Sequence, residues 1–134
     1  MKVLPNLFRI TSLVIFLQLL LGGLLTFGFI TPTAHIVTGF IVFILAIATM
    51  ILVLVSKPSF RPLRGVSIGM VALIIIQIIL GFETLSSGSQ TLAWIHFAVA
   101  MGIYGMSVTG SVMAFSWNNA ARAQMSLKQE NEKV

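Results

Sequence analysis

The chain has 134 residues, of which 57% are hydrophobic and 8% are charged, and its formal net charge is +5. A soluble domain carries about 25% charged residues, so a chain with a mean hydropathy of +1.05 belongs in a lipid bilayer. The absence of cysteine excludes disulfide bonds, thiolate-held iron–sulfur clusters and covalently attached c-type haem.

The first apolar segment follows a short amphipathic start, residues 1–10, in which Pro5 discourages an early helix. Residues 11–30 are predicted to be the first membrane span. This run is too long for the hydrophobic region of a cleaved signal peptide, so we expect it to be retained. Thr31 is predicted to cap the next helix, and Pro32 suits its first position.

Three further apolar runs each reach the length of about 20 residues that a helix needs to cross the hydrocarbon core. They cover residues 32–56, 65–85 and 92–117. A basic, proline-containing loop over 57–64 and a polar turn over 86–90, with Thr91 as a cap, are predicted between them. Residues 1–117 are therefore expected to form an all-α, integral membrane four-helix bundle, followed by a polar cytoplasmic tail at 118–134.

The basic residues predict the orientation of the chain. They lie only in the N-terminal segment, the central loop and the tail: Lys2, Arg9, Lys57, Arg61, Arg64, Arg122, Lys128 and Lys133. The turns at 31–33 and 86–91 contain none. The positive-inside rule therefore predicts a multi-pass plasma-membrane protein with both termini in the cytoplasm. The positive charge marks topology and lipid contact, and we expect no nucleic-acid partner.

The two halves of the chain repeat one pattern. Gln18-Leu-Leu-Leu-Gly22 recurs as Gln77-Ile-Ile-Leu-Gly81, and each copy is followed by one of the only two histidines, His35 and His96. The glutamine and histidine are separated by 17 residues in the first copy and 19 in the second. Two helical hairpins of the same direction imply a pseudo-twofold axis along the membrane normal, which would bring both histidines to one depth in a central cavity.

Paired imidazoles from facing helices are a known way to hold a cofactor in a bundle core. We predict that His35 and His96 ligate the iron of haem b, giving a centre suited to one-electron transfer. The haem propionates would lie near the helix N-termini on the outer side. The alternative is two packed, hydrogen-bonded histidines, but intramembrane ionisable groups are costly, and their matching positions favour ligation. Zinc fits less well because structural zinc requires four ligands.

Small residues occupy equivalent places in the two copies, and they are candidate haem contacts: Gly22 and Gly81, Gly39 and Ala100. Close packing of helices explains them equally well. Gln18 and Gln77 lie near mid-span, where hydrogen bonds between helices are their more common role. Glu83 is the only acid within a span and is a weak catalytic candidate, or a residue exposed at the interface.

The motif Gln-x-x-Leu-Gly, followed by His-x-x-x-small at the start of the next span, resembles the haem A synthase family. That family has two four-helix halves, each with a histidine pair, and converts haem O to haem A. The resemblance covers about residues 12–116, one half of such a protein, and implies that His35 and His96 are haem ligands. Pro32 stands where the catalytic half has a glutamate and Ile36 where it has an arginine, so the chain resembles the half that holds a permanent haem b.

The sequence thus predicts a membrane haem b protein for electron transfer or haem maturation at the outer side of the membrane. Three alternatives remain. A homodimer could have haem A synthase activity, an oxidoreductase reaction in which Glu83 would be the available acid. The chain could be an accessory subunit of a respiratory or oxidase complex. It could also be a small transporter coupled through Glu83. We expect a homo-oligomer or a subunit of a membrane complex.

Overall fold

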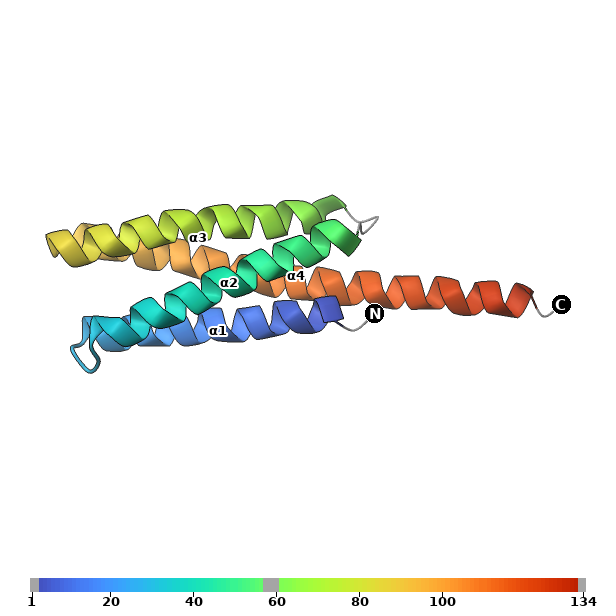
Figure 1. Ribbon diagram of the computed structural model, residues 1–134, viewed down its shortest axis with the longest axis horizontal. Coiled ribbons are helices and arrows are strands. Elements are labelled where there is room, and N and C mark those ends of the chain that lie inside the picture. Colours follow the sequence, from blue (N-terminus) through green and yellow to red (C-terminus); the bar gives the residue numbers. More distant parts are fainter. Residues whose placement is uncertain (1–2, 57–60, 133–134) are drawn as a thin grey trace.

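The fold is a bundle of four helices, seen in a computed structural model that describes residues 3–56 and 61–132. Figure 1 shows the helices running side by side with alternating direction. In chain order they are α1 (Val3–Thr26), α2 (Pro32–Ser56), α3 (Arg61–Ser87) and α4 (Gln90–Asn131). All four are long and apolar enough to cross a membrane by length and composition. The predicted all-α, multi-pass four-helix bundle is confirmed.

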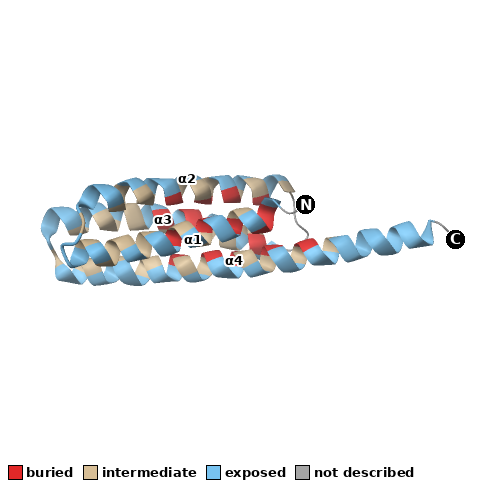
Figure 2. Cartoon of the chain, turned by 90° about the horizontal axis from the view of Figure 1, so that it is seen from below, coloured by how far each residue is buried: buried red, intermediate tan, exposed pale blue. Residues whose placement is uncertain are grey.

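Each helix packs against two neighbours. Helix α1 packs closely against α2 and α4, and α3 against the same two, while the backbones of the diagonal pairs stay farther apart within the described ranges. Helix α4 has 42 residues, about 63 Å at 1.5 Å per residue, and its C-terminal part projects alone beyond the bundle (Figures 1 and 2). The predicted tail is therefore, up to Asn131, a continuation of the fourth span.

Helix α1 begins and ends earlier than the sequence predicts. It starts at Val3 rather than residue 11, because Pro5 lies in the first turn, where a backbone N–H needs no helical partner. It ends at Thr26, because Gly28 adopts a left-handed conformation with φ of 75°. Phe29 N then donates to Leu24 O at 2.9 Å, which caps the open carbonyls of the last turn.

The ends of the other helices also depend on local residues. Helix α2 starts at Pro32, as predicted. Helix α3 starts at Arg61, so the second half of the predicted 57–64 loop is helical, and residues 57–60 lie outside the described part of the chain. Helix α3 ends at Ser87, and Gly88 follows it in a left-handed conformation with φ of 64°. Ser89, rather than Thr91, caps α4 by accepting a hydrogen bond from Leu92 N at 3.4 Å.

The packed core fills only one half of the bundle. Buried residues in α1 and α3 end at Ile15 and Ile74, and those in α2 and α4 begin at Val42 and Ile103. Figure 2 shows the buried residues confined to the half that carries the N-terminus. We call this the core half. The other, which contains both turns between hairpin helices, is the cavity half.

The internal repeat extends to the packing. An offset of 59 residues relates α1 to α3, and an offset of 61 relates α2 to α4. Eight buried positions of the first hairpin then have buried counterparts in the second: Leu4 and Leu63, Phe8 and Ser67, Thr11 and Met70, Ile15 and Ile74, Val42 and Ile103, Ala46 and Ser107, Thr49 and Gly110, Val53 and Ala114. The two hairpins therefore present equivalent faces to a shared core, and the cavity half inherits the same symmetry.

Candidate functional site: a paired-histidine cavity

The cavity half encloses a cavity of ≈ 430 Å³ bounded by residues of all four helices. Its volume falls within the range of about 300–1,000 Å³ that is typical of small-molecule and cofactor sites. The last core residues form its floor: Ile15, Val42, Ile74 and Ile103. Most other lining residues are aliphatic or aromatic, which suits a largely apolar ligand.

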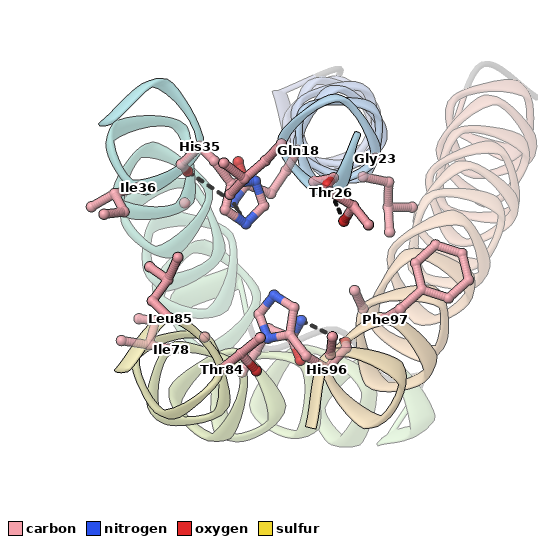
Figure 3. Close-up of a pocket in the computed structure, with 18 of the residues that line it drawn as sticks. Gln18, Gly23, Thr26, His35, Ile36, Ile78, Thr84, Leu85, His96 and Phe97 are labelled. Atoms are coloured by element: carbon pink, nitrogen blue, oxygen red, sulfur yellow. Dashed lines mark hydrogen bonds between the residues drawn. The ribbon is translucent and has the colours of Figure 1, made fainter. Parts of the chain in front are cut away.

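His35 and His96 project into this cavity from opposite walls, on α2 and α4 (Figure 3). Their ring centroids are 6.1 Å apart, and the ring planes are inclined by 64°. Two imidazoles on opposite sides of one metal need about 6.2 Å, from two metal–nitrogen bonds of about 2.0 Å and about 1.1 Å from each nitrogen to its centroid. The centroid distance of the pair is therefore close to that of two imidazoles that share one metal ion.

A glutamine from the neighbouring helix holds the backbone at each histidine. Gln18 Nε2 donates to His35 O at 2.9 Å, and Gln77 Nε2 donates to His96 O at 2.7 Å. Each bond joins the two helices of one hairpin, so the interhelical hydrogen bonds expected of these glutamines are present. Because they anchor the carbonyl of the histidine itself, they set the depth and direction of the imidazole.

The first glutamine also defines the tautomer of its histidine. Gln18 Nε2 lies 3.2 Å from His35 Nε2. An amide nitrogen carries two protons and accepts nothing, so the ring nitrogen is the acceptor in this contact. His35 Nε2 therefore holds a lone pair, which accepts from Gln18, and Nδ1 holds the proton. This contact would have to open for Nε2 to bind a metal ion.

Both hairpins leave the same polar atoms without partners. Five buried side-chain polar atoms in the described residues lack a hydrogen bond, and four belong to this site: Gln18 Oε1, His35 Nδ1, Gln77 Oε1 and His96 Nδ1. Such atoms are uncommon in folded proteins, and each calls for an explanation such as a functional role. Their occurrence at equivalent positions marks the site as the least internally satisfied region of the bundle.

Three of the four small residues of the repeat lie close to a histidine or to Gln18. A Cβ atom on Gly22 would lie 3.2 Å from His35 Cε1, and one on Gly81 would lie 3.1 Å from His96 Cε1. A Cβ on Gly39 would lie 3.0 Å from Gln18 Nε2. Ala100 carries a Cβ at the corresponding place in α4. All four residues line the cavity, so they shape it, and the glycines on α1 and α3 seat the imidazole edges.

Threonines complete the polar lining, and the sequence prediction missed them. Thr26 and Thr84 line the cavity, and each hydroxyl donates to its own helix, to Gly22 O at 2.9 Å and Leu80 O at 2.7 Å. Their oxygens remain able to accept. Gln77, Gly81 and Thr84 are spaced at i, i+4 and i+7, so extending the repeated motif along its helical face would have found Thr84.

The charged residues lie away from the cavity. Glu83 is exposed at the end of α3 and does not line the cavity, although its neighbours Phe82 and Thr84 do. Among the described residues, Arg9, Arg61 and Arg64 belong to the core half and the remaining cations to the C-terminal part of α4. No described cation lies at the mouth of the cavity, so an anionic group on a ligand would interact with helix N-termini and hydroxyl groups instead.

The ligand set is limited to two histidines. The described part of the chain holds no group of three or more histidine, cysteine, aspartate or glutamate side chains close enough to bind a metal ion. Two ligands suit a metal that arrives with its equatorial positions already filled, as iron does in a porphyrin. No protein-family model, no curated protein and no solved structure matches this chain.

Proposed function

We propose that the cavity binds haem b, with His35 and His96 as axial ligands. The observation that carries this proposal is the ring-centroid distance of 6.1 Å between two imidazoles facing across a mainly apolar cavity. The resemblance to the haem b-holding half of haem A synthases supports the same choice of ligand. Haem with two imidazole ligands supplies one-electron transfer.

The surrounding residues would have distinct tasks. Gln18 and Gln77 fix the histidine backbones, and Gly22 and Gly81 allow the rings to lie against the neighbouring helices. The apolar floor of the cavity, formed by Ile15, Val42, Ile74 and Ile103, would separate the site from the core half and limit water from that side. These residues would hold the two histidines near their ligating positions before a ligand arrives, which lowers the entropy cost of binding.

The site would act at the outer side of the membrane. The positive-inside rule places both termini in the cytoplasm, and the cavity half then faces the outer side of the plasma membrane. We propose electron transfer or haem maturation there, in a homo-oligomer or as a subunit of a membrane complex. A reaction of the haem A synthase type would need an acid in the cavity, and the position of Glu83 outside it favours an electron-transfer role.

A reduced-minus-oxidised absorbance spectrum of the purified protein tests the proposal. The wild type should show b-type bands, and His35→Ala and His96→Ala should each remove them while retaining helical circular dichroism. Glu83→Gln is the matched control, since that side chain lies outside the cavity, and it should keep the bands. Titration of the purified protein with haemin should saturate at one haem per chain.

A clear result would reject the proposal. If the folded wild type stays colourless after expression with abundant haem, and if haemin binds without saturation, the cavity does not bind haem. Recovery of a colourless protein together with other membrane subunits in mild detergent would instead support the accessory-subunit hypothesis.

A further inference from the structure

A second hollow lies on the outside of the bundle, between α1 and α4, and shares no residue with the histidine cavity. It is a groove of ≈ 300 Å³. Its lining residues on α1 are Arg9, Ser12, Leu13 and Phe16, and those on α4 are Tyr104, Val108, Ser111 and Val112. Four of these eight side chains are polar, on a surface that is otherwise rich in exposed apolar residues.

The internal repeat provides a direct comparison, because the α2–α3 surface is equivalent by the same offsets. The polar residues of the groove have apolar counterparts there: Ile68 for Arg9, Val71 for Ser12, Phe43 for Tyr104 and Met50 for Ser111. The repeat keeps the same positions buried in the core, and at these four groove positions the α1–α4 side carries the polar group each time. General requirements of bundle packing do not explain this difference, since the α2–α3 side meets them without polar groups.

The charge of Arg9 has no acidic side chain to balance it. The chain contains three acids, Glu83, Glu130 and Glu132. Glu83 lies in the cavity half, and the other two lie at the far end of α4, where Glu132 pairs with Lys128 at 3.7 Å. A cation within a membrane-spanning segment is costly unless it reaches the interface or meets an anion. An anion that pairs with Arg9 would therefore come from outside the protein's side chains.

The depth and orientation of Arg9 suit a lipid phosphate. It lies six residues after the start of α1, about 9 Å along the helix, whereas Arg61 and Arg64 occupy the first turn of α3. Its guanidinium carbon stands 5.4 Å from the centroid of the Phe115 ring, a cation–π contact that keeps the charge beside α4. The groove continues toward Phe16, about 10 Å deeper, whose ring is 5.8 Å from that of Tyr104.

We propose that this groove binds an anionic phospholipid from the leaflet on the side of the chain termini. Arg9 binds the phosphate, the hydroxyls of Ser12 and Ser111 lie within the same groove as further polar groups, and an acyl chain follows the apolar lining toward Tyr104. Basic pockets between transmembrane helices are a recognised means of binding anionic head groups. The site is independent of the histidine cavity, which lies in the other half of the bundle.

Native mass spectrometry of the detergent-solubilised protein with phosphatidylglycerol or phosphatidylcholine tests the proposal. The wild type should retain phosphatidylglycerol in preference to phosphatidylcholine, and Arg9→Gln should weaken that binding by about five-fold, the effect of one interfacial charge. Arg122→Gln is the matched control because it removes an equal charge from the exposed part of α4 beyond the bundle.

Three outcomes would overturn this assignment. Equal loss in Arg9→Gln and Arg122→Gln would mean that lipid follows net charge alone. Equal retention of both lipids by the wild type would mean that the groove does not select an anionic head group. Displacement of phosphatidylglycerol by inorganic phosphate alone would show that the acyl chain adds nothing. Thermal unfolding of Arg9→Gln in neutral detergent should match the wild type, which separates lipid loss from misfolding.

Discussion

Gly22→Ala is expected to damage the histidine site while leaving the bundle intact. The new Cβ would lie 3.2 Å from His35 Cε1, whereas carbon atoms pack best at about 3.5–4.0 Å. The imidazole would therefore have to retreat by about 0.3–0.8 Å, and a preorganised site tolerates about 0.5 Å. Alanine is otherwise favoured over glycine within a helix by roughly 0.5–1 kcal/mol, so the fold itself should not weaken.

The adjacent residue supplies the control. A Cβ on Gly23 would meet nothing within 4 Å, so Gly23→Ala adds the same methyl group to the cavity lining and gains the same helix propensity without touching the ring. Haemin titration followed by absorbance should show affinity about ten-fold lower for Gly22→Ala, at the low end of the 10–100-fold losses seen when the partners of metal ligands are altered. Gly81→Ala should behave like Gly22→Ala, because its Cβ would lie 3.1 Å from His96 Cε1.

Equal haem affinities in the Gly22→Ala and Gly23→Ala proteins would contradict this expectation. That result would mean that the ring is not held against α1. Thermal unfolding followed by circular dichroism must accompany the titration, since a fall in melting temperature confined to Gly22→Ala would trace the affinity loss to misfolding.

Three other predictions test the charge, packing and topology of the bundle. Haem dimethyl ester should bind within about three-fold of haem, because no described cation lies at the mouth of the cavity; strong preference for free propionates would contradict this. Gly110→Ala should destabilise the bundle by about 1–3 kcal/mol in thermal unfolding, because the Phe8 ring fills the space of the new Cβ, whereas Gly102→Ala meets nothing and should not destabilise it. In the naturally cysteine-free chain, Ser87→Cys should react with an impermeant maleimide from outside intact cells and Ser126→Cys only after lysis; the reverse pattern would invert the topology.

Hydropathy and the repeat predicted the spans and the histidine pair for physical reasons. A backbone in lipid must satisfy its own hydrogen bonds, so a long apolar run is sufficient to indicate a helix. The helix boundaries depended instead on local detail, such as the left-handed Gly28 that ends α1 and the Ser89 cap that begins α4. Several polar side chains next to an apolar run could each cap a helix, and the sequence did not distinguish between Ser89 and Thr91.

By itself the sequence determined that the chain forms four apolar helices in two equivalent hairpins, because composition and periodicity act along the chain. Only the tertiary structure decided that the core packs in one half, that Gly22 seats the ring of His35, and that α1 and α4 form a partly polar groove between them. These properties depend on which faces of different helices meet. Residues such as Arg9 and Tyr104 are 95 positions apart, and no local pattern shows that they line the same surface.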